Sequence, residues 1–295
     1  MMEKNQNLSC ILCGKKCFVK LYKINSYDII KCEYCGLIFT NIPIDVAVQN
    51  DFLSQIYSDK YFKGNISTEG TDKSGYEKNY FEDKRYEVVV NARSRLKKIE
   101  QLKPQKGRIL DIGCAAGFFL NEAKLRGWQP FGIELSNLAA DFARNQLNLN
   151  VITGIFESVK LPENYYDVIT AWDVIEHVFN PLRFIEKAYK ILKPDGILVI
   201  GTPNIGSLAH KIRKARWKIL APPEHIFYFN PTTLKLLLKS TFDEVNVLAT
   251  YPPYSRTEKK FKARLKKLLY QEFNILAQML NLGEYILAYA WKQNN

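Results

Sequence analysis

Short apolar runs alternate with amphipathic stretches from residue 108 onward. The runs are typical of buried strands and lie at residues 109–112, 128–133, 151–153, 167–171 and 196–201. Stretches between them repeat apolar residues at helical spacing, as Leu138, Phe142 and Leu147 do behind the N-cap residue Ser136. This alternation predicts an α/β fold with a Rossmann-like, doubly wound and mostly parallel sheet.

The same pattern continues through the second half of the chain. Asn180-Pro181 is an N-cap followed by a first-turn proline, which predicts a helix to Leu192 and then a turn at 193–196. The remaining predicted elements are a helix at 232–240 and two strands at 244–249 and 285–291. With these two strands the predicted sheet has seven.

Composition divides the chain into three regions. Residues 1–40 are rich in cysteine and too few to bury a core of their own, with strands predicted at 19–22 and 29–31. Residues 41–104 form a helical and aromatic preamble. Residues 105–295 form the α/β domain, in which we expect a lid insertion at 204–231 and a basic helical insertion at 252–283.

Four of the six cysteines form two C-x-x-C pairs with eighteen residues between them: Cys10, Cys13, Cys32 and Cys35. This is the spacing of a structural four-thiolate zinc site. Gly14 and Gly36 follow the two pairs and can adopt the positive φ that turns backbone N–H groups toward sulfur. Disulfides and a redox pair are the alternatives, and Cys17 is a spare thiol nearby.

The segment from Asp111 to Gly117 follows the first strand as a loop of small residues and leads into a helix. Glycines there let a ligand approach bare backbone. A second strand ends at Glu134, 23 residues after Asp111, where a carboxylate suits the two hydroxyls of a ribose. The alternative is a strand–turn–helix packing motif that binds no ligand.

Residues 109–134 resemble the cofactor site of class I S-adenosylmethionine-dependent methyltransferases, whose loop is D-x-G-x-G-x-G. Ala115 replaces the middle glycine of that pattern, which also disfavours a dinucleotide pyrophosphate. The resemblance implies that Asp111 and Gly113 border the methionine moiety, that Glu134 binds the ribose and that the preamble covers the pocket. The other cofactor-binding residues that we predict are Cys114, Ala115, Gly117, Phe118, Leu135, Phe156, Glu157, Trp172 and Asp173.

A second motif, Asp173-Val174-Ile175-Glu176-His177, follows the fourth predicted strand of the sheet. Three interpretations stay open for Asp173, Glu176 and His177. In the first, they shape the loop without a metal, as in many such methyltransferases. In the second, they hold a divalent metal, as in the similar ubiquinone-pathway O-methyltransferases. In the third, His177 is a base.

Glu224 and His225 lie in the predicted lid. They resemble the Glu-His element of nucleotide-sugar methyltransferases that also carry an N-terminal zinc module. The resemblance implies His225 as catalytic base and Glu224 as its orienting partner. The alternative is that His225 only packs or caps the lid. Those relatives usually carry a further C-terminal domain, which we do not expect from this sequence.

Two basic segments hold nearly all of the net charge of +12: residues 211–218 and residues 256–267. Both are predicted at the ligand-binding edge of the sheet, where they would attract an anionic acceptor. A nucleotide sugar or phosphate-linked glycan is favoured. A membrane-held prenyl or quinone precursor, RNA and a merely solvated helix face are the alternatives.

These features predict an S-adenosylmethionine-dependent methyltransferase that acts on oxygen or carbon of a small anionic or glycan-like acceptor. A cofactor-holding scaffold and a nucleic-acid adaptor are the non-enzyme alternatives. The chain shows neither an apolar stretch of the roughly 20 residues that cross a bilayer nor a signal-peptide pattern. We therefore expect a cytoplasmic protein, with peripheral contact at an anionic inner membrane face as a further option.

Overall fold

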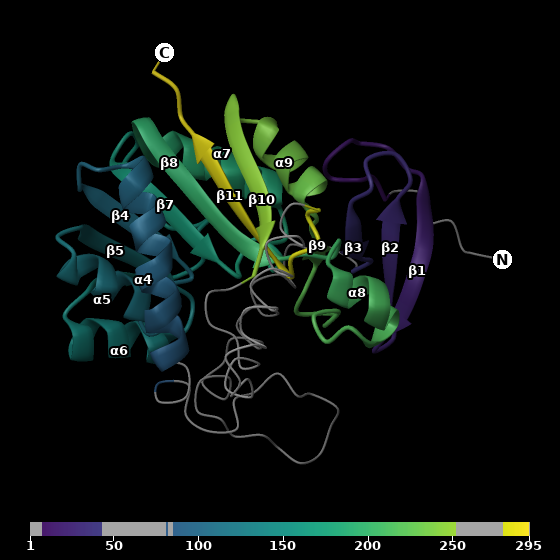
Figure 1. Ribbon diagram of the computed structural model, residues 1–295, viewed down its shortest axis with the longest axis horizontal. Helices are drawn as coiled ribbons and strands as arrows, with labels where there is room; N and C mark the ends of the chain where they lie inside the picture. The colour runs from purple at the N-terminus through teal and green to yellow at the C-terminus, as the bar shows by residue number, and fades with distance from the viewer. Residues whose placement is uncertain (1–7, 43–80, 82–84, 252–279, 295) are drawn as a thin grey trace, which may run out of the picture.

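A computed structural model describes residues 8–42, 81, 85–251 and 280–294, which form two sheets (Figure 1). The larger sheet has seven strands in the order β10-β11-β8-β7-β4-β5-β6. Its strands are β4 (Arg108–Ile112), β5 (Gln129–Glu134), β6 (Asn150–Thr153), β7 (Tyr166–Trp172), β8 (Leu192–Pro203), β10 (Glu244–Thr250) and β11 (Tyr285–Trp291).

Most neighbours in this sheet are parallel, which confirms the predicted fold class. The last strand, β11, runs antiparallel to both β8 and β10. The predicted turn at 193–196 lies inside β8, which begins at Leu192: the register with β7 shifts between Leu192 and Ile197, and Asp195 has φ of 59°. Backbone hydrogen bonds with Lys292, which accepts from Asp195 and donates to Gly196, hold this segment at the sheet.

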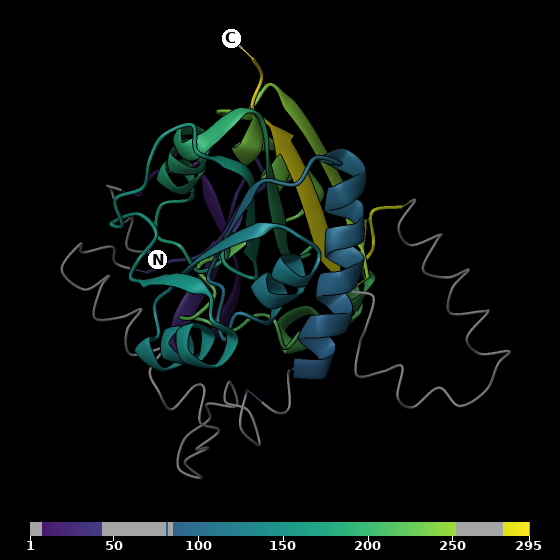
Figure 2. The ribbon, with the colours of Figure 1, turned by 90° about the vertical axis from the view of Figure 1, so that its left-hand side faces the viewer.

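Helices cover both faces of the large sheet (Figures 1 and 2). One face carries α4 (Arg85–Leu102), α5 (Phe118–Leu125) and α6 (Asn137–Leu147). The other carries α7 (Pro181–Ile191) and α9 (Pro231–Lys239). Ser136 caps α6 as predicted, since its hydroxyl accepts a hydrogen bond from the N–H of Ala139 at 3.3 Å.

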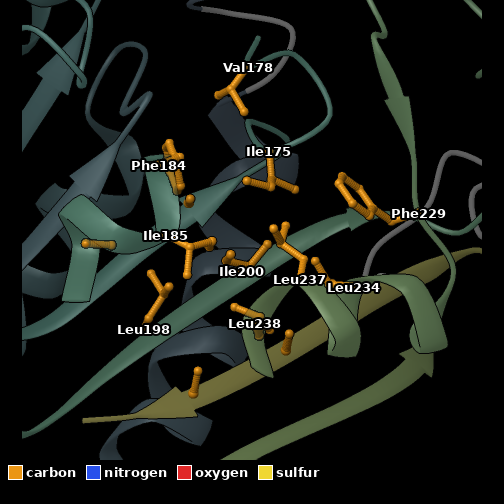
Figure 3. Close-up of a cluster of buried hydrophobic side chains, with 14 of the residues drawn as sticks. Ile175, Val178, Phe184, Ile185, Leu198, Ile200, Phe229, Leu234, Leu237 and Leu238 are labelled. Atoms are coloured by element: carbon orange, nitrogen blue, oxygen red, sulfur yellow. The ribbon is translucent and has the colours of Figure 1, made fainter. Parts of the chain in front are cut away.

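The core lies on both sides of the sheet because successive side chains of a strand point to opposite faces. On β8, Ile197 and Val199 pack under α4 and α5. Leu198 and Ile200 pack on the opposite face against α7 and α9 (Figure 3). Burial on both faces explains why the strands are continuous apolar runs in the sequence.

The smaller sheet joins the N-terminal region to the lid. Its strands are β1 (Phe18–Ile24), β2 (Tyr27–Cys32), β3 (Ile38–Thr40) and β9 (Phe227–Tyr228). Strand β9 belongs to the predicted lid, which also contains α8 (Leu208–Arg213) and the short 3-10 helix η1 (Lys214–Arg216). Figure 1 shows β9 between β3 and the large sheet. The N-terminal region is therefore packed on the α/β domain rather than tethered to it.

Most of the predicted insertion at 252–283, and residues 43–80 and 82–84 of the preamble, lie outside the described residues. Within the described part of the chain, no helix combines the length and the apolar character needed to traverse a lipid bilayer.

Candidate cofactor and acceptor site

The loop after β4 has the backbone conformation that its glycines allow. Gly113 and Gly117 have φ of 70° and 76°, and Ala115 between them has φ of 48°. A Cβ on Gly113 would lie 2.6 Å from the Val174 side chain, and one on Gly117 would lie 2.6 Å from Leu149. Both glycines are therefore required by space as well as by backbone conformation.

Glu134 ties this loop to the end of β5. Its Oε2 accepts a hydrogen bond from the N–H of Ala115 and its Oε1 accepts one from Ser136, both at 2.8 Å. Burial raises the pKa of Glu134, and the backbone donors oppose that shift. A carboxylate has about four acceptor positions, so Glu134 can hold the loop and still bind ribose hydroxyls.

Asp111 ends β4 beneath the loop. Its Oδ1 accepts a hydrogen bond from the Thr170 hydroxyl at 2.6 Å, and burial raises its pKa to about 7. Cys114 is also buried, and burial holds the pKa of its thiol well above the usual value. Such a thiol is not a nucleophile at neutral pH.

We predict that Gly113→Ala weakens S-adenosylhomocysteine binding by about ten- to a hundredfold, because a Cβ strains the left-handed backbone and meets Val174. Ala115→Gly is the matched control, since glycine relieves the positive φ there. Calorimetric titration of both variants measures the difference. Equal affinity of Gly113→Ala and the unaltered protein would show that the loop does not carry the ligand.

Arg95 of α4 is a site residue that the sequence did not reveal. Its guanidinium lies 4.0 Å from the ring centroid of Trp172, and it donates a hydrogen bond to the Tyr285 hydroxyl at 3.2 Å. Its charge also acts on Asp111. Arg95 therefore places a cation beside the predicted methionine end of the site. The helical spacing of α4 is the only sign of Arg95 in the sequence, and it does not distinguish this arginine from the others on the helix.

The other predicted cofactor residues divide between the core and the surface. Phe118 and Phe156 are buried, and their rings pack against Phe142 and Phe184. Leu135 is partly exposed and Glu157 is exposed. The roles of these side chains in binding stay predictions.

The second motif forms a turn at the carboxyl end of β7. Asp173 is exposed with φ of 55°, whereas Glu176 is only 2% exposed. The Glu176 Oε2 accepts a hydrogen bond from Thr202 at 2.9 Å. Its Oε1 is buried without a hydrogen-bond partner among the described residues. Burial, followed by the charge of Asp173, holds the pKa of Glu176 well above its usual value.

His177 and His225 meet beside this carboxyl group. Their ring centroids are 4.6 Å apart, and among the described residues they form, with Glu176, a group whose potential ligand atoms lie within 4.8 Å of one another. His177 Nδ1 contacts the Glu224 carbonyl oxygen at 2.8 Å. The observed orienting group is thus a backbone carbonyl acting on His177, and the role of the Glu224 carboxylate toward His225 stays a prediction.

Both imidazoles are neutral at neutral pH. Burial lowers the pKa of His177 to about 4. Burial, followed by neighbouring His177, lowers the pKa of His225 to about 3, and a hydrogen bond to the Ile219 carbonyl opposes this shift. A neutral imidazole carries one N–H donor and one nitrogen that can accept a proton.

A narrow pocket lies between this group and the lid, and in this structure it is closed and has no room for a water molecule. Its lining residues are Glu176, Thr202, Pro203, Ile205, Trp217, Ile219, His225, Phe227 and Tyr228. Trp217 is flanked by exposed Arg216 and Lys218, the last two cations of the basic segment 211–218. The pocket thus combines a buried carboxyl group and an imidazole with aromatic and apolar side chains.

The four cysteines of the two pairs converge in the N-terminal region. The Sγ atoms of Cys10 and Cys35 are 3.5 Å apart, and those of Cys13 and Cys32 are 3.6 Å apart. Tetrahedral zinc with Zn–S bonds of about 2.3 Å places its sulfurs about 3.8 Å apart, so the cluster fits zinc. Gly14 and Gly36 have φ of 69° and 80°, as predicted.

The two cysteine turns are alike in their backbone hydrogen bonds. The N–H of Gly14 donates to the Cys10 carbonyl, and the N–H of Gly36 donates to the Cys32 carbonyl. Exposed Cys17 lies outside the cluster, with its thiol 3.1 Å from a Glu33 oxygen.

A family model described as a methyltransferase domain matches residues 80–241, more than half of the chain. The chain belongs to this methyltransferase family. Its core is a class I S-adenosylmethionine-dependent methyltransferase domain, as the seven-stranded sheet and the loop after β4 also show.

Curated relatives of this methyltransferase include ubiquinone biosynthesis O-methyltransferases. That of Coxiella burnetii is 34% identical over 116 residues, which cover 37% of this chain and 50% of the relative. That of Actinobacillus pleuropneumoniae is 26% identical over 146 residues, covering 46% and 57%. The chain thus spans about half the length of these relatives.

Solved structures share the fold of the methyltransferase domain. A SAM-dependent methyltransferase from Archaeoglobus fulgidus aligns with a TM-score of 0.54 at 22% identity, over 72% of this chain and 98% of that one. Phosphoethanolamine N-methyltransferase 2 of Haemonchus contortus, in complex with S-adenosyl-L-methionine, gives a TM-score of 0.52 at 16% identity, over 87% and 62%.

Proposed function

We propose that the protein transfers the methyl group of S-adenosylmethionine to an oxygen or carbon atom of a small anionic or glycan-like acceptor. The observation that carries this proposal is the loop from Asp111 to Gly117 tied to Glu134, next to a pocket that holds a proton acceptor. The glycines at 113 and 117 allow the left-handed turns of the loop and the close packing of Val174 and Leu149, and Glu134 retains acceptor capacity for a ribose.

S-adenosylmethionine supplies a reactive methyl group, so the chain mainly binds and orients. The Arg95 guanidinium is suited to the carboxylate of the methionine moiety, because it is planar, charged and keeps donors beyond the one given to Tyr285. Trp172 packs below it as an apolar wall. Together they orient the cofactor at the carboxyl end of β7, beside the pocket of Glu176 and His225.

His225 is the proposed base for the acceptor. Burial lowers its pKa to about 3, which keeps the ring unprotonated but makes it a weak base, so this role requires the bound acceptor and cofactor to raise that pKa toward neutrality. The unpaired Oε1 of buried Glu176 can bind a polar group of the acceptor. Exposed Arg216 and Lys218, which flank the pocket-lining Trp217 in the sequence, would favour phosphate-bearing acceptors, which supports a nucleotide sugar or phosphate-linked glycan.

A quinone or prenyl precursor is the second candidate acceptor, supported by the similarity to ubiquinone biosynthesis O-methyltransferases. A divalent metal would accompany that candidate. Among the described residues, Glu176 and His177 converge with His225, whereas Asp173 of the predicted set lies outside the group. Imidazole and carboxylate donors suit a transition metal.

We also propose that the cysteine cluster holds structural zinc. The two sulfur–sulfur distances of 3.5 and 3.6 Å suit a tetrahedral zinc ion, and all four sulfurs lie within 4.8 Å of one another. Backbone N–H groups of Leu12 and Cys13 donate to the Cys10 sulfur, and those of Tyr34 and Cys35 donate to the Cys32 sulfur. The role proposed is structural, because four thiolates leave no open ligand position for chemistry.

We predict that Arg95→Ala weakens S-adenosylmethionine binding by about ten- to a hundredfold, the effect of losing a charge-assisted hydrogen bond. Arg93→Ala is the matched control, since Arg93 lies on the same helix but pairs with Glu122 at 2.9 Å. Titration calorimetry with cofactor and with S-adenosylhomocysteine measures both variants. Failure of the unaltered protein to bind either compound would contradict the proposed function.

A further inference from the structure

The N-terminal cysteine region, residues 8–42, is bonded directly to the segment that carries His225. Strand β3 pairs antiparallel with β9, with Ile38 opposite Tyr228 and Phe39 opposite Phe227. The N–H of Thr40 donates a hydrogen bond to the Ile226 carbonyl at 2.8 Å. The small sheet therefore continues from the cysteine region into the wall of the acceptor pocket.

The Thr40 side chain adds a contact that strand pairing alone does not provide. Its hydroxyl donates a hydrogen bond to the His225 carbonyl at 2.8 Å and lies 3.2 Å from the Tyr228 hydroxyl. Thr40 is only 2% exposed. A buried carbonyl that loses its donor is costly, so this hydroxyl holds the His225 backbone in one position.

The opposite side of the same segment is held by the methyltransferase domain. The N–H groups of Ile226 and Phe227 both donate to the Glu176 carbonyl, at 2.8 and 3.0 Å. Glu176 also lines the pocket, and its Oε1 lies 3.9 Å from His177 Nε2. Residues 225–228 are thus clamped between Thr40 and Glu176.

We propose that the cysteine region positions the acceptor pocket, with Thr40 as the positioning residue for His225. This inference rests on the proposed function, because the proposed function places the methyl acceptor beside the His225 segment. Apolar packing supports it, because Phe39, Cys32 and Phe227 belong to the same buried cluster as the core beneath α7 and α9. Loss of order at the cysteine cluster would therefore reach the pocket without disturbing the cofactor loop.

Hydrogen exchange measured by mass spectrometry on the full chain tests this proposal. In Thr40→Val, which keeps the β-branched shape, we expect amides of residues 224–229 to exchange about five- to tenfold faster, as one lost hydrogen bond implies. Peptides from β1 and β2, metal content and S-adenosylhomocysteine affinity should not change. Thr40→Ser keeps the hydroxyl and should restore the slow exchange.

Two results would overturn the proposal. One is unchanged exchange at 224–229 in Thr40→Val, and the other is faster exchange throughout β1 and β2, which would mean that the region unfolds. Neither result depends on an acceptor. If the unaltered protein fails to bind S-adenosylhomocysteine, the proposed function fails while the exchange data still decide the role of Thr40.

Discussion

His225→Ala is expected to lower methyl transfer by about a hundred- to ten-thousandfold, the usual contribution of a positioned base. The physical reason is that His225 lines the pocket as a neutral imidazole, which has one nitrogen able to accept a proton. Cofactor affinity should stay unchanged, since His225 is not part of the loop after β4. Conversion of S-adenosylmethionine to S-adenosylhomocysteine with a panel of nucleotide sugars and phosphoglycans measures the effect.

The matched control for this experiment is His210→Gln. His210 packs on Trp217 and contacts the Tyr22 hydroxyl, and it does not line the pocket. It should keep turnover within a few-fold. Retained turnover in His225→Ala would remove His225 from the mechanism.

Chelation separates the two proposed roles of His225. If the ring ligates a divalent metal with Glu176 and His177, turnover of the unaltered protein should fall under conditions that leave the cysteine-bound metal in place. If chelation does not change turnover, a catalytic metal is excluded and the role of His225 as a base remains.

Cys32→Ala is expected to abolish zinc binding and to unfold the N-terminal region. Four-thiolate zinc contributes on the order of 10–16 kcal/mol to the folding of small domains, and this region is too small to fold on apolar burial alone. Cys32 is fully buried, and its N–H donates to the Leu37 carbonyl. Elemental analysis should show the loss of about one equivalent of zinc, and thermal unfolding should begin at a lower temperature.

Cys17→Ser is the control for that prediction. Cys17 is exposed and bonded to Glu33, so its loss should change neither metal content nor stability. Zinc retained by Cys32→Ala, or absent from the unaltered protein, would contradict the four-thiolate site. The cofactor loop should still bind its ligand in Cys32→Ala, because the seven-stranded sheet packs around α4, α5 and α6 on its own.

Most of the large sheet could be predicted from the sequence because its strands are buried on both faces. The strand predicted at 285–291 coincides with β11, and that at 109–112 lies within β4. Strand β9 could not be predicted, since Phe227 and Tyr228 form a strand only by pairing with β3, almost 190 residues earlier in the chain. The extension of β8 through 193–196 likewise depends on Lys292.

The candidate site follows the same division. By itself, the sequence determined the features that depend on local backbone chemistry: the glycines of the cofactor loop, Glu134 at the end of its strand and the spacing of the four cysteines. Only the tertiary structure decided that Arg95 lies over Trp172, that His177 and His225 meet at Glu176, and that Thr40 holds the His225 carbonyl. The physical reason is that a positive φ or a C-x-x-C turn depends on residues that are neighbours in the sequence. A contact between elements far apart in the chain forms only when the sheet and its helices pack.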